Sequence, residues 1–316
     1  MNTKLKAGVA RRIISPPRGI YLIGYGDRTW GNRGVHDDLT ATALVLEDAA
    51  NRVVILACDL LAINEITLAN LRAKSDDNII LCTSHTHSGP IVYADKRASR
   101  KNKAYRDYLI SQLLDAILEA GKNLQPVSLS WASGQADIAV NRRQRKKDSS
   151  TEIGVNPDGV VDHSIGIMQI QTPDAKPFAN LVNFCCHNVV LGPRNLLVSA
   201  DWAGAMRRRV EMATGVPCLF IQGATADLNP DHQWGNADFE AVEELGKRAA
   251  QGVLSGMADL TPFGGVPLIF QEREVWFQLE AAAQTPSPPD AYKKKLSETT
   301  GIPKLLVSKI LNIRYP

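Results

Sequence analysis

Short apolar runs alternate with stripes of apolar residues at helical spacing over the first 280 residues. Arg52–Asp59 and Asn78–Ser84 are almost continuously apolar, which is typical of strands buried on both faces. Lys103–Ala120 has apolar residues three and four positions apart, which predicts a helix with one buried face. The other expected elements, in chain order, are helix Asn64–Lys74, strands Val127–Ala132, His163–Thr172 and Phe178–Cys186, helix Asp201–Thr214, strand Pro217–Gln222, helix Phe239–Leu254 and strand Val266–Leu279.

This order of elements predicts an α/β fold of mixed β-sheets layered with helices. Strands followed by helices favour α/β architecture, and the turn at Pro173–Lys176 predicts a hairpin between two of the strands. We expect residues 1–280 to form a single large domain. Thr285–Pro289 (TPSPP) interrupts any regular element, so we expect 281–316 to be a C-terminal tail or a remainder of the same domain.

Charge and cysteine content exclude several classes of protein. A formal net charge of +3 is too small to indicate nucleic acid or an anionic membrane as a partner, and the basic clusters are typical of solvated surfaces. All five cysteines lie in apolar runs and none forms a CxxC pair, which indicates free thiols in a reducing compartment. With no signal-peptide pattern at the N-terminus and no apolar window of about 20 residues, we expect a cytoplasmic protein without a transmembrane segment.

Histidines follow two of the expected strands. In Thr83–Pro90 (TSHTHSGP), His85 and His87 stand two positions apart, so an extended backbone points both to one side. His187 directly follows the strand that ends at Cys186. Ligands of open α/β sheets bind beyond the carboxyl ends of strands, and imidazole is a common zinc ligand. The sequence therefore predicts a zinc site here, and the spacing alone permits either His85 or His87 as a ligand.

A third polar segment, Gly223–Pro230 (GATADLNP), follows the strand that ends at Gln222. Its small residues allow close approach of a ligand, and Asp227 and Asn229 supply an acid and an amide. The alternative interpretation is a simple turn, since Asp and Asn favour turns.

Two other hydrolase classes that use an HxH motif do not match. Metallo-β-lactamase-like hydrolases need HxHxDH, whereas Ser88 and Gly89 follow His87 in this chain. Amidohydrolase barrels also begin with HxH at a strand end, but they need a closed parallel barrel. The hairpin expected at Pro173–Lys176 argues against such a barrel.

Several segments together resemble the N-terminal catalytic domain of neutral, non-lysosomal ceramidases, in the order in which that family carries them. Thr83–Pro90 is similar to the zinc-site signature of the family and is the most specific of them. The similarity covers roughly residues 5–280. The other matching segments are Ala7–Ala10, Ile13–Pro17, Gly24–Gly26, Gly34–Asp38, Ala41–Glu47, Asn141–Arg143, Asn183–His187, Val198–Trp202 and Gln222–Pro230.

The resemblance implies a zinc ion bound by two histidines, a glutamate and a tyrosine. The two histidines correspond to His85 and His187, which leaves His87 beside the metal as a proton acceptor or donor. Arg142 would stabilise an oxyanion or hold a substrate hydroxyl. The glutamate and tyrosine of the family lie past residue 280, and nothing up to Pro316 resembles their motifs. Either Asp227, another residue or another chain would complete the site, or the chain is a truncated product with an incomplete site.

Asn229 stands where the family has a serine implicated in catalysis, and an asparagine cannot act as a nucleophile. We therefore expect a zinc-dependent hydrolase that cleaves the amide bond of a small or lipid-like, ceramide-like N-acyl amide by metal-activated water. The alternative is a degenerate family member that binds a ligand or partner without turnover.

Overall fold

The computed structural model describes residues 5–26, 28, 30–92, 100–232, 238–264, 267–273 and 275. Met1–Phe270 form one unit and Gln271–Pro316 a second, and the fold below is that of the first unit. The expected tail over 281–316 lies outside the described residues. The domain boundary expected near residue 280 therefore stays a prediction.

Two five-stranded mixed sheets form the centre of the first unit. Sheet 1 has the order β5-β4-β3-β1-β6 and sheet 2 the order β14-β12-β11-β7-β16. In each sheet one pair of strands is parallel, β4 with β5 and β12 with β14, and the other neighbours are antiparallel. The strands of sheet 1 are β1 (Lys6–Ile13), β3 (Thr40–Glu47), β4 (Arg52–Cys58), β5 (Asn78–Thr83) and β6 (Gln125–Pro126), and those of sheet 2 are β7 (Ser128–Gln135), β11 (Ser164–Gln171), β12 (Pro177–Phe184), β14 (Cys218–Gln222) and β16 (Thr261–Phe263).

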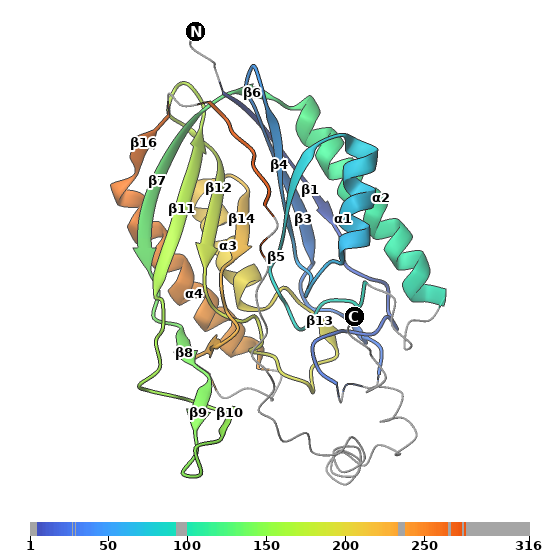
Figure 1. Ribbon diagram of the computed structural model, residues 1–316, viewed down its shortest axis with the longest axis vertical. Coiled ribbons are helices and arrows are strands. Elements are labelled where there is room, and N and C mark those ends of the chain that lie inside the picture. Colours follow the sequence, from blue (N-terminus) through green and yellow to red (C-terminus); the bar gives the residue numbers. More distant parts are fainter. Residues whose placement is uncertain are drawn as a thin grey trace. The chain divides into compact units, whose positions relative to one another are not determined.

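Alternation of side chains along the strands produces four layers, helix–sheet–sheet–helix. In β3, Ala43 and Val45 pack with α1 (Glu65–Ser75) and α2 (Arg100–Lys122) in one apolar cluster. Leu44 and Leu46, on the opposite face, pack with sheet 2 in a second cluster. The far face of sheet 2 packs against α3 (Asp201–Thr214) and α4 (Phe239–Gly256). Figure 1 shows α1 and α2 outside one sheet and α4 outside the other.

Short elements that the sequence pattern did not indicate surround the lower end of the sheets in Figure 1. β8 pairs with β15, β9 with β10, and β2 with β13, each in a two-stranded ladder. With two or three residues each, these strands are too short to show an alternation of apolar and polar residues in the sequence. Their bounds are β2 (Gly34–Val35), β8 (Ala139–Asn141), β9 (Arg143–Arg145), β10 (Thr151–Ile153), β13 (Leu197–Val198) and β15 (Leu228–Pro230), and a 3-10 turn, η1 (Met257–Asp259), follows α4.

One expected element is wrong. No described residue of the expected strand Val266–Leu279 lies in a strand, and the strand of this region is β16, which pairs with β7. Leu268 packs against the core between the sheets, which explains its apolar character. Its backbone N–H donates to the Asp48 carboxylate at 2.8 Å, and its carbonyl accepts from the Asn51 side chain at 2.7 Å. Side chains thus satisfy backbone groups that a ladder would otherwise pair.

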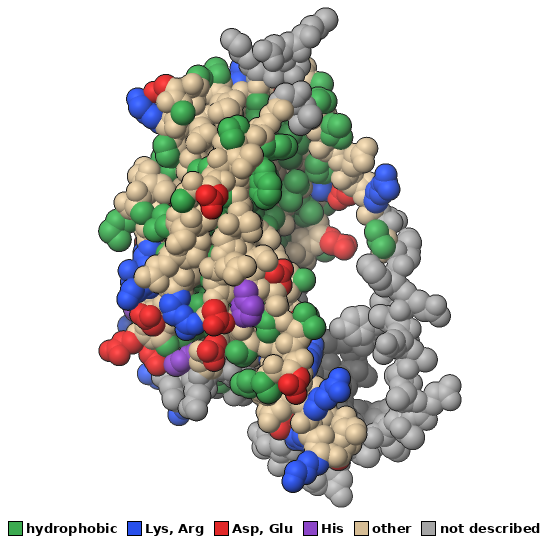
Figure 2. Space-filling view, turned by 90° about the vertical axis from the view of Figure 1, so that its left-hand side faces the viewer, with side chains coloured by type: hydrophobic (Ala, Val, Ile, Leu, Met, Phe, Trp, Pro, Cys, Tyr) green, Lys and Arg blue, Asp and Glu red, His purple; other side chains and the backbone are tan. Residues whose placement is uncertain are grey.

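The α/β class with mixed sheets is confirmed, as is the hairpin of β11 and β12. Among the described residues, no helix has both the length and the apolar content required to cross a membrane. On the face shown in Figure 2, acidic and basic side chains gather mainly in the lower half, whereas the upper half is largely uncharged.

Candidate metal centre

Two loops, one from each sheet, bring three histidines together. His85 and His87 follow β5, and His187 follows β12. The loops meet in a parallel bridge between Thr86 and Asn188, and the His87 N–H donates to the Asn188 carbonyl at 3.1 Å. The carboxyl ends of the two strands therefore bring the three imidazoles to one place.

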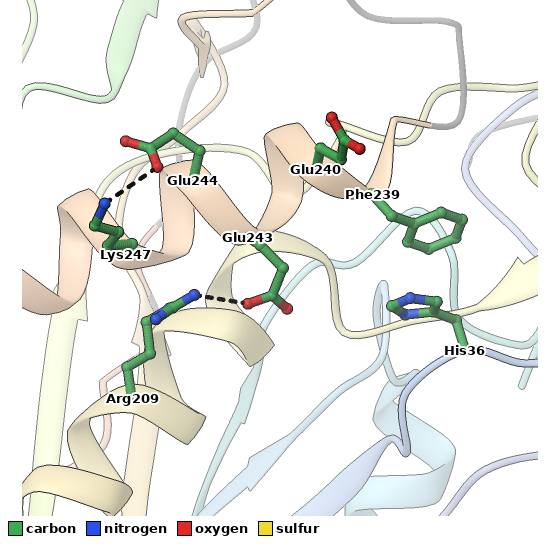
Figure 3. A pocket seen from close by; sticks show the side chains of 7 residues that line it. All are labelled: His36, Arg209, Phe239, Glu240, Glu243, Glu244 and Lys247. Atoms are coloured by element: carbon green, nitrogen blue, oxygen red, sulfur yellow. Dashed lines mark hydrogen bonds and ion pairs between the residues drawn. The ribbon is translucent and has the colours of Figure 1, made fainter.

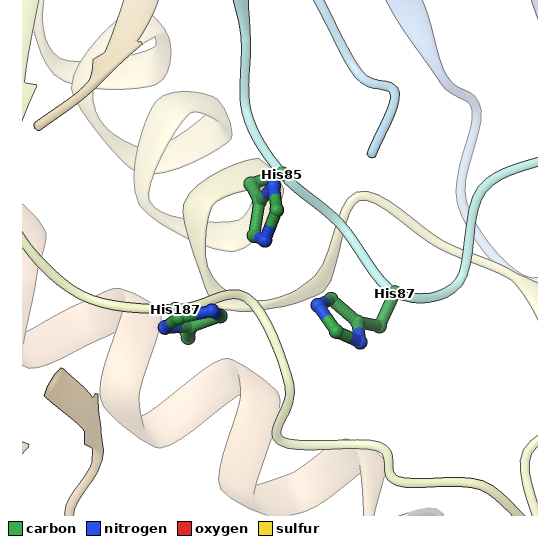
Figure 4. A group of neighbouring side chains, drawn as sticks. All are labelled: His85, His87 and His187. Atoms are coloured by element: carbon green, nitrogen blue, oxygen red, sulfur yellow. The ribbon is translucent and has the colours of Figure 1, made fainter. Parts of the chain in front are cut away.

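The three imidazole rings lie edge to face around a common point (Figure 4). Ring centroids are 5.1 Å apart for His85 and His87, 5.0 Å for His85 and His187, and 5.8 Å for His87 and His187. One nitrogen from each ring lies within 4.8 Å of the others. Asp227 is not part of this group, so the structure does not bring its carboxylate in as a substitute ligand.

Backbone carbonyls fix the orientation of two of the rings. Nδ1 of His85 donates to the Leu61 carbonyl at 2.9 Å, and Nδ1 of His187 donates to the Leu228 carbonyl at 2.9 Å. A carbonyl can only accept, so both rings carry their proton on Nδ1 and present an unprotonated Nε2. Such an outer hydrogen bond is the usual support of a metal-binding histidine.

His87 is held differently. Both of its ring nitrogens are buried without a hydrogen-bond partner, whereas its carbonyl accepts from Arg28 Nη1 at 2.8 Å. Tyr25 packs edge-on against the ring, with centroids 5.1 Å apart. Gly24 leaves room for the ring, because a Cβ at this position would lie 2.5 Å from Nδ1. Unpartnered buried nitrogens carry a desolvation cost, so the ring nitrogens of His87 are available to a ligand.

The electrostatic surroundings keep the three rings neutral. Burial lowers the pKa of His87 to about 3, and the neighbouring His85 and His187 add to the effect. Burial likewise lowers the pKa of His187 to about 4 and lowers the pKa of His85. Neutral imidazole is the form that binds a metal.

The other predicted residues stand beside this cluster. Arg142 follows β8, and its Nε donates to the Ala226 carbonyl at 2.9 Å, while Nη1 donates to Asn229 Oδ1 at 3.3 Å. Its charge contributes to the lowered pKa of all three histidines. Asp227 accepts from Asn141 Nδ2 at 3.3 Å, and Asn229 is buried in β15. The structure thus joins Arg142 and Asn229 and turns Asp227 toward Asn141.

Sequence reasoning missed the residues that hold the two loops. The buried Asn188 side chain donates from Nδ2 to the Ser84 carbonyl and accepts the Ala203 N–H at 3.1 Å. Trp202 Nε1 donates to the His187 carbonyl at 2.9 Å. Asn188 directly follows His187 in the chain, but no pattern in the sequence identifies it as the link between the loops.

A surface pocket of about 730 Å³ lies apart from this centre, beside α3 and α4 (Figure 3). His36 stacks on Phe239 there with ring centroids 3.9 Å apart, and Arg209 pairs with Glu243 at 3.0 Å. None of the three clustered histidines lines it.

Four layers that gather three neutral imidazoles at the ends of strands from both sheets define a candidate metalloprotein. The chain belongs to the family of neutral/alkaline non-lysosomal ceramidases, because the family model "Neutral/alkaline non-lysosomal ceramidase, N-terminal" matches residues 6–218. The resemblance found in the sequence is thereby confirmed.

Individual relatives are distant and longer. The chain is 25% identical over 210 residues to neutral ceramidase A of Dictyostelium discoideum, covering 61% of this chain and 29% of the relative. It is 24% identical over 231 residues to a neutral ceramidase of Pseudomonas aeruginosa, and this match covers 66% of this chain and 34% of the relative. The chain thus spans about a third of the length of these relatives.

Solved structures show the same fold. The crystal structure of the neutral ceramidase from Pseudomonas aeruginosa superposes with a TM-score of 0.67 at 22% identity, over 82% of this chain and 45% of that one. A ceramidase complexed with C2 superposes with a TM-score of 0.69 at 21% identity, over 81% of this chain and 44% of that one.

Proposed function

We propose that this protein is a zinc-dependent amidase that cleaves an N-acyl amide, with the metal held by His85 and His187. The observation that carries the proposal is the pair of imidazoles whose Nδ1 atoms bind backbone carbonyls and which, together with His87, each place one ring nitrogen within 4.8 Å of the others. Membership of the ceramidase family supports amide chemistry. The two relatives are named neutral ceramidases, so a ceramide-like lipid amide is the first substrate class to test.

The donor set fits zinc. Neutral imidazoles are preferred zinc ligands, and the two unpartnered nitrogens of His87 mark a place where the protein alone leaves polar atoms unsatisfied. Zinc, when bound, polarises a carbonyl oxygen and lowers the pKa of a water molecule. A catalytic zinc usually has three protein ligands, so a further ligand is expected besides His85 and His187.

The protein's own residues have separable roles in the hydrolysis. Water adds to the carbonyl carbon, the C–N bond breaks, and a proton passes to the departing amine. His87 is placed to relay that proton without retaining it, since no protein group occupies its ring nitrogens and burial lowers its pKa to about 3. Arg142 is fixed by Ala226 and Asn229, so its charge is oriented in advance toward negative charge on the carbonyl oxygen.

The direct test measures zinc content by mass spectrometry, together with hydrolysis of a fluorescent N-acyl amide. We expect one zinc per wild-type chain, and loss of both zinc and activity in His85→Ala and His187→Ala. His163→Ala is the matched control, because this half-exposed histidine bonds to the Ala136 carbonyl away from the cluster. A wild-type chain without zinc after reconstitution would refute the proposal.

A second candidate function is ligand binding without turnover. The Asn229 side chain favours it, because its Oδ1 accepts from Arg142 and an amide supplies no nucleophile. Tight zinc binding without hydrolysis of any N-acyl amide would support this alternative.

A further inference from the structure

Two neighbouring arginines converge on one carbonyl oxygen at the edge of the candidate metal centre. The Ala226 carbonyl accepts from Arg142 Nε at 2.9 Å and from Arg143 Nη2 at 3.1 Å. Successive side chains of an extended strand normally point to opposite sides, so the shared acceptor draws together two charges that would otherwise separate. Like charges held this close repel each other.

No carboxylate within the described part of the chain forms an ion pair with either arginine. Asp227 is the nearby carboxylate that could pair with them, but it accepts a hydrogen bond from Asn141 Nδ2 instead. Burial lowers the pKa of Arg142, the charge of Arg143 lowers it further, and the charge of Asp227 offsets part of this effect without forming an ion pair. An anion that bound both guanidinium groups would relieve this repulsion.

The arginine pair adjoins the histidines through one short segment, 226–229. The Ala226 carbonyl binds both arginines, and the Leu228 carbonyl accepts from Nδ1 and the backbone N–H of His187. Asn229 completes the hold on Arg142. A ligand bound at the arginines therefore lies next to the imidazole cluster and not on a remote surface.

The hairpin that starts at Arg143 adds positive charge to this edge. β9 has the sequence Arg-Gln-Arg and is exposed, and Lys146 and Lys147 follow it. Of these four cations, Lys146 pairs with Glu152 across the hairpin. Figure 2 shows basic side chains on the projecting lower part of the molecule, where Figure 1 places β9 and β10.

We propose that the amide substrate of this protein carries an anionic group, a carboxylate or a phosphate, which Arg142 and Arg143 bind beside the metal centre. That the ligand is an amide substrate rests on the proposed amidase function. That it carries an anionic group rests on the arginine pair. Arg143 is the specificity-determining residue, because Arg142 also serves the reacting carbonyl.

Three probes with one acyl chain test the proposal: N-dodecanoylglycine, N-dodecanoyl-O-phosphoethanolamine and neutral N-dodecanoylethanolamine. With the zinc-loaded full chain, we expect kcat/KM for one or both anionic probes to exceed the neutral value by about 10-fold or more. The stronger anionic probe identifies carboxylate or phosphate as the group. Arg143→Gln should lower the ratio of kcat/KM for the anionic probe to kcat/KM for the neutral probe by about 10-fold.

Arg143→Lys should retain part of the preference, because a lysine keeps the charge but loses the planar fork of donors. Lys122→Gln at the end of α2 removes one positive charge away from the site and should change nothing. A preference that survives Arg143→Gln, or a wild type that favours the neutral probe, would overturn the proposal.

Calorimetric binding of the same probes to the zinc-free chain separates this inference from the proposed function. Arg143-dependent binding of an anionic probe without hydrolysis of any amide would support the anion site and refute the amidase. Hydrolysis of the neutral probe without any anion preference would support the amidase and refute the anion site.

Discussion

Arg207 on α3 donates from Nη2 to Oδ2 of Asp59 at 2.6 Å, and both side chains are buried. Asp59 directly follows β4, so the ion pair joins the outer helix of one sheet to a strand end of the other. The next two carbonyls, those of Leu60 and Leu61, accept from the backbone N–H and Nδ1 of His85. The ion pair therefore supports the chain segment on which one proposed zinc ligand rests.

Removing one partner of this pair should be strongly destabilising. We expect Arg207→Met or Asp59→Asn to lower the free energy of unfolding by about 3–5 kcal/mol, since either leaves a buried polar or charged group uncompensated. The double variant Asp59→Leu/Arg207→Met should recover much of the loss. Denaturant unfolding measures both effects, and Lys176→Ala, which breaks the exposed pair with Asp174, should change stability far less. Equal losses for the buried and exposed pairs would contradict the prediction.

Asn188 should control zinc affinity without touching zinc. Asn188→Ala removes the bond to the Ser84 carbonyl and leaves the Ala203 N–H unpaired, so the two histidine loops lose their link. We expect about 10- to 100-fold weaker zinc binding, measured by competition with a chromophoric chelator. Asn180→Ala is the matched control, because this buried asparagine of β12 bonds to Gln169 and Thr214 away from the site. Equal loss of zinc affinity in both variants would indicate a general effect on folding.

Gly24 should tolerate no side chain. Its φ is +115°, and a Cβ would lie 2.5 Å from Nδ1 of His87. Gly24→Ala should cost about 1–3 kcal/mol and displace the His87 ring. Denaturant unfolding and the imidazole signals in NMR spectra would report the two effects. Gly26→Ala, where a Cβ would meet no atom within 4 Å, should leave both unchanged.

Asp201 should give the stability of the protein a specific pH dependence. Burial raises the pKa of its carboxyl to about 6 from an ordinary value of 3.8, although three backbone N–H groups donate to it. The folded protein thus binds this proton more tightly than the unfolded chain does. The stabilisation is complete below pH 3.8 and is lost as the pH rises through about 6, a change of roughly 3 kcal/mol.

Unfolding of wild type and Asp201→Asn from about pH 4 to pH 8 isolates this contribution. The asparagine does not titrate, so the stability of wild type relative to the variant should fall as the pH rises. Parallel stability curves would show that Asp201 is not the source.

Local patterns identified most long elements of the fold. The period of Lys103–Ala120 and the apolar run of Asn78–Ser84 correspond to α2 and β5, because a long element with one buried face repeats its pattern several times. The strand predicted from Val266 is wrong. Leu268 is apolar because it packs between the sheets, and such packing does not require its backbone to form strand hydrogen bonds.

The sequence by itself determined the α/β class, the family and the strand ends at which His85, His87 and His187 stand, because these depend on local pattern and motif. Only the tertiary structure decided that loops from two different sheets meet, that Asn188 locks them together, and that Arg143 joins Arg142 at the Ala226 carbonyl. Asn188 and Ser84 lie 104 positions apart, and Arg143 and Ala226 lie 83 apart. Contacts over such separations follow from the packing of the four layers and leave no periodic trace in the chain.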